Sequence, residues 1–167
     1  MKHNKIILIG MMGSGKSTIS KALAQKNNLE LIELDEIFEK QENISIKDFF
    51  KEFKEEKFRQ IETEILKKAL EKQNSIISTG GGIVLKKENR DLLENYFTIY
   101  LKASPETLFE RLKNDNSRPL LQTQNPKKEI EKILSTREQY YSKAKQTIET
   151  DNKTKEEIIK EIEQWIK

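Results

Sequence analysis

The 167-residue sequence contains no cysteine. Disulfide bonds and cysteine-ligated metal sites are therefore excluded. Long apolar runs are also missing. The N-terminus lacks the apolar core of a signal peptide, and no segment approaches the roughly 20 apolar residues that span a bilayer. We therefore expect a cytoplasmic protein with no membrane partner, folded as one domain over residues 1–167.

Charge of one sign is not in large excess either. The 31 Lys and Arg residues nearly balance 28 Asp and Glu, which leaves a formal net charge of +3. Lysine alternates with glutamate along most of the chain. This pattern is typical of solvated helix faces rather than of a nucleic-acid-binding surface. We expect a monomer that binds no nucleic acid.

Glycine is scarce, with six residues, yet three of them surround one lysine in GMMGSGKS, Gly10–Ser17. The segment matches G-x-x-x-x-G-K-[ST], between a strand-like run at Lys5–Ile9 and a helical pattern at Ser17–Gln25. This is the context of a P-loop, whose backbone N–H groups surround a phosphate. The following helix N-terminus adds partial positive charge. We expect Lys16 at the β- and γ-phosphates and the Ser17 hydroxyl on Mg²⁺, so the chain is predicted to bind a nucleoside triphosphate.

Strand-like runs alternate with helical ones along the rest of the chain. This alternation predicts a parallel sheet covered on both faces, with the active site beyond the carboxyl ends of the strands. The expected strands are Lys5–Ile9, Glu30–Leu34, Ser75–Ser78, Phe97–Leu101 and Thr147–Thr150. The irregular, polar stretch NDNSRPLLQTQNP, about 114–126, holds two prolines and is expected to form a mobile lid.

Two predicted helices carry charges on their apolar stripes. In the helix at about 54–72, Glu62 falls near the middle of the stripe and Arg59 inside its edge, three residues apart and so able to touch. In the helix at about 127–145, Arg137 sits at the centre of the stripe. A buried charge is costly unless it is paired. Arginine suits bidentate contacts to carboxylate or phosphate, so both arginines are candidates for anion recognition. The alternatives are a side chain that extends its charged end into solvent and a structural ion pair.

Two further segments follow predicted strands directly. STGGG, Ser78–Gly82, has three glycines, which allow the backbone to approach a ligand closely. ELDE, Glu33–Glu36, ends the second strand, which we expect beside the phosphate loop. Glu33 and Asp35 are two apart and so face the same side while the strand lasts. One is a candidate for the metal and the other for a hydroxyl proton, although ordinary strand-end carboxylates are the alternative.

In this order and spacing, these segments resemble the shikimate kinase family nearly end to end. The residues that carry the resemblance are GMMGSGKST (Gly10–Thr18), Asp35, FRQIE (Phe58–Glu62), STGGG (Ser78–Gly82), RPLL (Arg118–Leu121) and Arg137 of TREQYY. The resemblance implies an α/β three-layer P-loop fold, like that of nucleoside monophosphate kinases, with a central five-stranded parallel sheet and a lid. It also implies transfer of the γ-phosphate of ATP to the 3-hydroxyl of shikimate, a step toward chorismate and the aromatic amino acids.

The resemblance assigns a role to each matching position. Asp35 holds substrate hydroxyls and is the candidate base, Arg59 and Arg137 bind the shikimate carboxylate, and Glu62 orients Arg59. The substrate pocket is lined by Gly80, Gly81 and Gly82. ATP is held by Gly13, Ser14, Gly15, Lys16, Ser17 and Thr18, with Arg111 along the adenine and Arg118 closing from the lid over the phosphates. Catalysis is expected to rest on Lys16, Asp35 and Arg118.

One position departs from the family pattern. Many members carry aspartate two residues before the substrate aspartate, where it helps to hold the waters of the metal. This chain has Glu33 there, longer by one methylene. We expect Mg²⁺ to bind Ser17 directly and Glu33 through water.

Three other functions are alternatives for a chain with this phosphate loop. A GTPase switch requires D-x-x-G, which does not occur, and N-K-x-D, where Asn152–Lys155 ends in lysine. A kinase of another small acid, such as gluconate, stays open on the two arginines alone, whereas the GGG and RPLL segments favour shikimate. A nucleoside monophosphate kinase would bind a base and a phosphate at the acceptor site.

Overall fold

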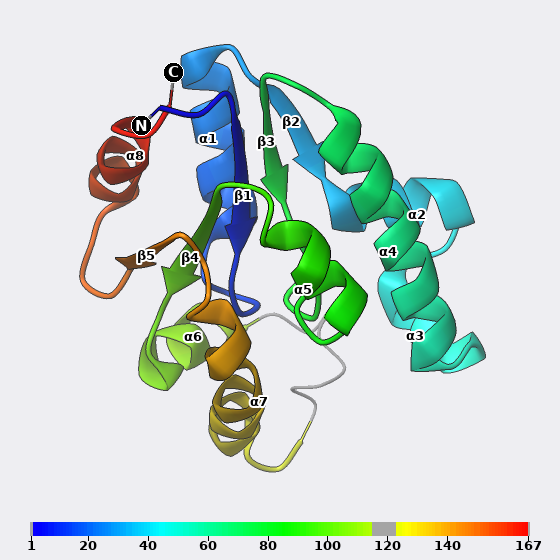
Figure 1. The fold of residues 1–167 in the computed structure, drawn as a ribbon. Helices are drawn as coiled ribbons and strands as arrows, with labels where there is room; N and C mark the ends of the chain where they lie inside the picture. The colour runs from blue at the N-terminus through cyan, green and yellow to red at the C-terminus, as the bar shows by residue number, and fades with distance from the viewer. Residues whose placement is uncertain (1, 115–122, 167) are drawn as a thin grey trace.

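The computed structural model describes residues 2–114 and 123–166 (Figure 1). Within these residues one parallel sheet has five strands in the order β2-β3-β1-β4-β5. The strands are β1 (Lys5–Ile9), β2 (Glu30–Glu33), β3 (Ser75–Ser78), β4 (Thr98–Lys102) and β5 (Gln146–Glu149). In the register, Ser78 of β3 lies opposite Leu8 of β1 and Glu33 of β2. The expected parallel sheet is therefore confirmed.

Helices cover both faces of the sheet, as two separate apolar clusters show. Ile7 and Ile9 of β1 join the core beneath α2 to α7, whereas Ile6 and Leu8 face α1 and α8. This alternation along one strand produces the expected three layers. The helices are α1 (Lys16–Asn27), α2 (Leu34–Glu42), α3 (Ile46–Glu52), α4 (Glu55–Glu71), α5 (Lys87–Leu93), α6 (Pro105–Leu112), α7 (Pro126–Tyr141) and α8 (Lys155–Glu163).

Some expected boundaries were wrong. The helix expected at 127–145 ends at Tyr141, because the chain turns there to enter β5. In that turn the Ala144 amide donates to the Tyr141 carbonyl at 3.0 Å, and the Lys145 amide donates to Thr98 Oγ1 at 3.2 Å. The fourth and fifth strands begin one residue later and one residue earlier than expected.

β2 is not the neighbour of β1 in the sheet, although its carboxyl end lies near the phosphate loop as expected, with Glu33 close to Ser17. β2 pairs with β3, and β3 separates it from β1. The reason is that α1 crosses over β3 to reach β2. The strand also ends at Glu33, and α2 begins at Leu34, so Asp35 lies in the first turn of a helix and not on a strand.

In the described ranges, no helix has both the length and the apolar character needed to cross a bilayer. The expected lid at 114–126 includes residues 115–122, which lie outside the described residues, and Arg118 is among them.

Candidate active site

The segment Gly10–Ser17 links β1 to α1 and has the backbone of a phosphate-binding loop. Gly13 and Gly15 have φ of 79° and 95°, a left-handed conformation that a Cβ disfavours. Lys16 begins α1, and its Nζ donates to the carbonyls of Gly10 at 2.8 Å and Met11 at 2.9 Å. These bonds hold the ammonium group over the loop, at the positive end of the helix.

Ser14 and Arg111 lie at the same loop. The Ser14 hydroxyl is buried and has no hydrogen-bond partner among the described residues. A buried polar atom of this kind calls for an explanation, and a bound phosphate would provide one. Arg111 of α6 donates to the Gly13 carbonyl at 3.3 Å and to Thr150 Oγ1 at 3.2 Å. Ser17 and Thr18 are exposed in the first turn of α1.

The three glycines after β3 form one side of the site. The residues predicted to bind the phosphate acceptor approach these glycines from three helices. A Cβ placed on Gly80 would lie 2.9 Å from Asp35 Oδ1 of α2 and 3.0 Å from Glu62 Oε1 of α4. A Cβ on Gly82 would overlap the Arg59 guanidinium, 2.6 Å from its Cζ. The absence of side chains on this segment is therefore what allows the charged groups to reach it.

The middle glycine, Gly81, lies next to both the phosphate loop and Arg137 of α7. A Cβ on Gly81 would lie 3.2 Å from the Met12 amide nitrogen of the phosphate loop and 3.6 Å from Arg137 Nη1 of α7. Arg137 is only 8% exposed, as the apolar stripe predicted. The structure thus brings both arginines, Asp35 and Glu62 around Gly80–Gly82, next to the phosphate loop.

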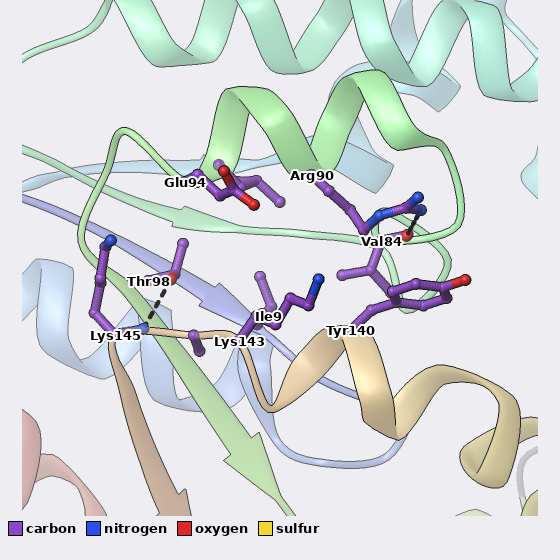
Figure 2. Close-up of a pocket in the computed structure, with 10 residues that line it drawn as sticks. Ile9, Val84, Arg90, Glu94, Thr98, Tyr140, Lys143 and Lys145 are labelled. Carbon is purple, nitrogen blue, oxygen red and sulfur yellow. Dashed lines mark hydrogen bonds between the residues drawn. The ribbon is translucent and has the colours of Figure 1, made fainter.

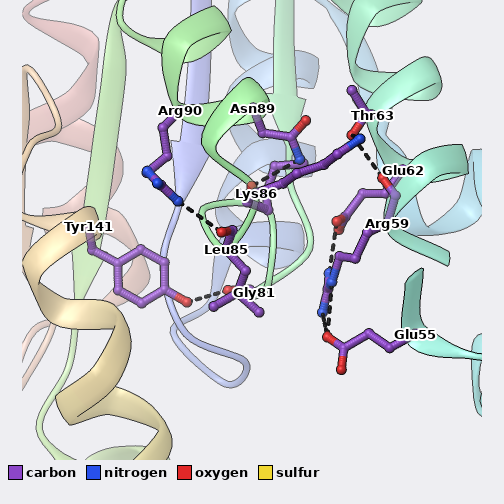
Figure 3. Close-up of polar contacts among 11 residues, drawn as sticks. Glu55, Arg59, Glu62, Thr63, Gly81, Leu85, Lys86, Asn89, Arg90 and Tyr141 are labelled. Carbon is purple, nitrogen blue, oxygen red and sulfur yellow. Dashed lines mark hydrogen bonds and ion pairs between the residues drawn. The ribbon is translucent and has the colours of Figure 1, made fainter. Parts of the chain in front are cut away.

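Arg59 and Glu62 form the ion pair that their helical spacing predicted (Figure 3). Arg59 Nη1 lies 2.8 Å from Glu62 Oε2, and its Nη2 lies 3.0 Å from Glu55 Oε1. Burial opposes the charge of Arg59, but Glu62 and Glu55 together raise its pKa above the ordinary value. Burial raises the pKa of Glu62, and Arg59 offsets only part of this effect. Arg59 is therefore a permanent cation in a partly buried place.

Ser17 of α1 and Glu33 of β2 lie close together, although β3 separates β2 from β1 in the sheet. Burial raises the pKa of Glu33, Ser17 opposes the shift, and Glu36 adds to it. No group of three or more His, Cys, Asp or Glu side chains arranged for a metal occurs in the described ranges. One hydroxyl and one carboxylate suit Mg²⁺, which keeps several of its waters.

Sequence reasoning missed the side chains that hold the chain after the glycines. Asn89 of α5 donates to the Ile83 carbonyl at 3.0 Å, and Arg90 donates to the carbonyls of Val84 and Leu85, each at 2.8 Å. The Arg90 guanidinium also lies 4.3 Å from the centre of the Tyr140 ring, at the edge of a small pocket (Figure 2). A polar residue on a short helix carries no periodic signal, so nothing in the sequence pattern marks these contacts.

Known proteins are similar to this chain in sequence and in fold. The profile of the shikimate kinase family matches residues 12–167. A curated shikimate kinase of Enterococcus faecalis is 43% identical over 166 residues, which cover 97% of this chain and 98% of the relative. The structure of the shikimate kinase from Acinetobacter baumannii in complex with shikimate superposes with a TM-score of 0.91 at 31% identity, covering 96% of this chain and 90% of that one.

A more distant structure shares the fold alone. The gluconokinase from Sinorhizobium meliloti has a TM-score of 0.63 at 19% identity and covers 96% of this chain and 90% of its own. The family profile and the curated relative, by contrast, span almost the whole sequence. On these grounds the chain belongs to the shikimate kinase family.

Proposed function

We propose that this chain transfers the γ-phosphate of ATP to the 3-hydroxyl of shikimate, giving ADP and shikimate 3-phosphate on the path to chorismate and the aromatic amino acids. Membership of the family supports this reaction. The observation that carries it is the convergence of Asp35, Arg59, Glu62 and Arg137 on Gly80–Gly82, directly beside a phosphate-binding loop. An anionic acceptor with hydroxyl groups fits that set of charges.

The phosphate loop is the proposed ATP site. The backbone of Gly13–Gly15 and the positive end of α1 would surround the phosphates, with Lys16 placed to neutralise charge on the transferring group. Arg111, which hydrogen-bonds Gly13, is proposed to lie along the adenine. Arg118 lies outside the described residues, and its closure over the phosphates stays a prediction.

Mg²⁺ is the proposed metal, held by the Ser17 hydroxyl and, through water, by Glu33. The contact between these two side chains supports the pairing. The extra methylene of glutamate, compared with the aspartate of many relatives, is accommodated because Glu33 already reaches Ser17. When bound, Mg²⁺ neutralises charge on the phosphates of ATP.

Arg59 and Arg137 are proposed to bind the acceptor carboxylate, and Asp35 to act on its hydroxyl. Two guanidinium groups that approach one backbone segment from α4 and α7 suit a planar carboxylate between them. The Asp35 carboxylate would accept the proton of the attacking hydroxyl while the oxygen forms its bond to the γ-phosphorus and ADP leaves. Positioning and charge neutralisation supply most of the rate.

An ADP-release assay with a panel of acceptors tests this assignment. Shikimate should support release, whereas gluconate and nucleoside monophosphates should not exceed the rate without acceptor. Release with gluconate alone would favour the small-acid kinase, whose fold this chain shares. Release with a nucleoside monophosphate would favour the third rival instead.

The cytoplasmic location, the monomeric state and the single domain over residues 1–167 stay predictions. The one sheet with its two apolar clusters supports the single domain. Sedimentation velocity measures the mass in solution, and a mass near 19.6 kDa is expected for the monomer.

A further inference from the structure

Each backbone carbonyl from Gly80 to Leu85 accepts a hydrogen bond, and the donors fall into three groups. Backbone amides within the segment serve Gly80 and Gly82: Ile83 donates at 3.2 Å and Leu85 at 3.0 Å. Asn89 and Arg90 of α5 serve the carbonyls of residues 83–85. Tyr141 of α7 serves Gly81 (Figure 3). The segment's own turn and α5 therefore fix the other carbonyls, and Tyr141 ties the segment to α7.

Tyr141 also contacts the arginine that we propose binds the acceptor. Arg137 and Tyr141 are four residues apart on α7 and so lie on one face of the helix. The Arg137 guanidinium lies close enough to the Tyr141 hydroxyl to lower its pKa against the effect of burial, and its Nη1 lies 3.6 Å from where a Cβ would stand on Gly81. One hydroxyl thus touches both Arg137 and the Gly81 carbonyl.

The direction of these bonds follows from the phenol having a single proton. Burial raises the pKa of Tyr141 to about 12, so the hydroxyl keeps its proton at neutral pH. It donates that proton to the Gly81 carbonyl, so its oxygen is left to face Arg137, which has donors only. The Gly81 carbonyl needs a donor and the Arg137 guanidinium needs an acceptor, and the Tyr141 hydroxyl suits both in this orientation alone.

We propose that Tyr141 is a positioning residue for the acceptor: its hydroxyl holds the Arg137 guanidinium against Gly81, at the distance at which Arg137 and the glycine segment bind shikimate together. This role rests on the proposed function. The tyrosine touches no reacting atom and acts through Arg137. Removing its hydroxyl frees the guanidinium to turn and leaves the Gly81 carbonyl without a donor.

The chain offers a closely matched control in Tyr100 of β4. Its ring stacks on the Tyr141 ring at 5.0 Å, and both side chains are almost fully buried. The Tyr100 hydroxyl donates to Glu138 Oε2 at 2.6 Å, away from Gly81. Tyr100→Phe and Tyr141→Phe therefore each remove one buried hydroxyl from the same aromatic stack, but only the second reaches the glycine segment.

The test compares steady-state kinetics of the two variants with the unaltered protein. Tyr141→Phe should raise the KM for shikimate about tenfold or more and leave the KM for ATP within about twofold. Tyr100→Phe should change neither constant by more than about twofold while lowering Tm to a similar extent. An equal shikimate KM in the two variants would overturn the proposal and leave Tyr141 a structural residue.

Two further arms keep the result decisive. If Tyr141→Phe is unfolded at the assay temperature, the rise of Tm with added shikimate is compared in both variants, and equal rises again overturn the proposal. If the unaltered protein releases no ADP with shikimate, the proposed function fails. Turnover by the unaltered protein with no selective defect in Tyr141→Phe overturns the positioning role alone.

Discussion

Glu62 forms an ion pair with Arg59 through one carboxylate oxygen, while its other oxygen is buried beside Gly80 with no hydrogen-bond partner among the described residues. Oε2 accepts from Arg59 Nη1 at 2.8 Å, whereas Oε1 has no hydrogen-bond partner among the described residues. A Cβ on Gly80 would lie 3.0 Å from that free oxygen. A buried oxygen without a hydrogen-bond donor is costly. A hydroxyl group of the bound substrate would supply that donor.

The stability of the protein should depend on the ionisation of Glu62. Burial raises its folded pKa above the ordinary value of 4.5, so the folded state binds the proton more tightly than the unfolded state. The stability linked to this group is therefore complete below about pH 4.5 and is lost as pH rises through the folded pKa. In urea unfolding at a series of pH values, Glu62→Gln should lack that decline. Glu55→Gln, which changes an exposed partner of the same arginine, should keep it, and parallel curves for all three proteins would contradict the assignment.

Lys16 should be needed for turnover rather than for folding. Lys16→Met removes the point charge over the phosphate loop, and kcat should fall roughly a hundredfold or more, as for the loss of one preorganised electrostatic donor. Lys26→Met, which breaks an exposed ion pair on the same helix, should leave kcat nearly unchanged. Near-normal turnover in Lys16→Met would show that the loop is not catalytic.

Arg137 should govern the acceptor and not the nucleotide. Arg137→Ala should raise the KM for shikimate by the equivalent of about 2–5 kcal/mol and leave the KM for ATP nearly unchanged. Arg137→Lys should rescue little, because a point charge does not replace the planar fork. Melting temperatures are measured alongside to detect misfolding. A folded Arg137→Ala protein with ordinary shikimate kinetics would make this arginine merely structural.

Alanine at two neighbouring glycines should separate the two substrates. In Gly82→Ala the new methyl group meets the end of a flexible side chain, Arg59, so folding should change little while the shikimate KM rises about 10- to 100-fold. In Gly81→Ala the methyl group meets the Met12 amide of the phosphate loop at 3.2 Å, so the KM for ATP should rise. Kinetics with each substrate varied in turn check both effects. The same pattern in both variants would argue against separate contacts.

Glu33 should set the magnesium requirement and its pH dependence. Glu33→Gln should raise the Mg²⁺ concentration for half-maximal activity roughly tenfold. Because the pKa of Glu33 is raised by burial, Mg²⁺ must displace a proton at the acid end of the range. The apparent affinity for Mg²⁺ in the unaltered protein should therefore increase as pH rises through that pKa, and Glu33→Gln should flatten the profile. Equal Mg²⁺ titrations of the two proteins would remove Glu33 from the metal site.

Periodicity and motifs predicted the helices and strands that carry the site better than they predicted the contacts between its side chains. The phosphate loop is recognisable from the spacing of its glycines and lysine, and the pairing of Arg59 with Glu62 follows from helical geometry alone. The side-by-side placement of Arg137 and Gly81 depends on how α7 packs against the glycine segment after β3, which no local pattern encodes. Tyr141 was not among the predicted site residues, since a hydrophobic pattern does not show where a tyrosine hydroxyl lies.

Strand order was the least accessible feature of the fold. A sequence of alternating elements fixes the parallel direction of the strands, but the choice between placing β2 next to β1 or next to β3 depends on the path of α1 over the sheet. The start of α2 at Leu34 was hidden for a related reason. Glu33 and Asp35 fit a strand pattern equally well, and only the packing of the helix decides between them.

The register of β3 makes the donor and acceptor halves of the site interdependent. Ser78 is aligned with Leu8 on one side and with Glu33 on the other, two residues before the first glycine, Gly80. A slip of one residue would move those glycines by about 3.3 Å and turn the strand's side chains to the opposite face. ATP binding and acceptor binding would then fail together. New acceptor preferences are therefore expected to arise through side chains on α2, α4 and α7, which can change while the central strand stays as it is.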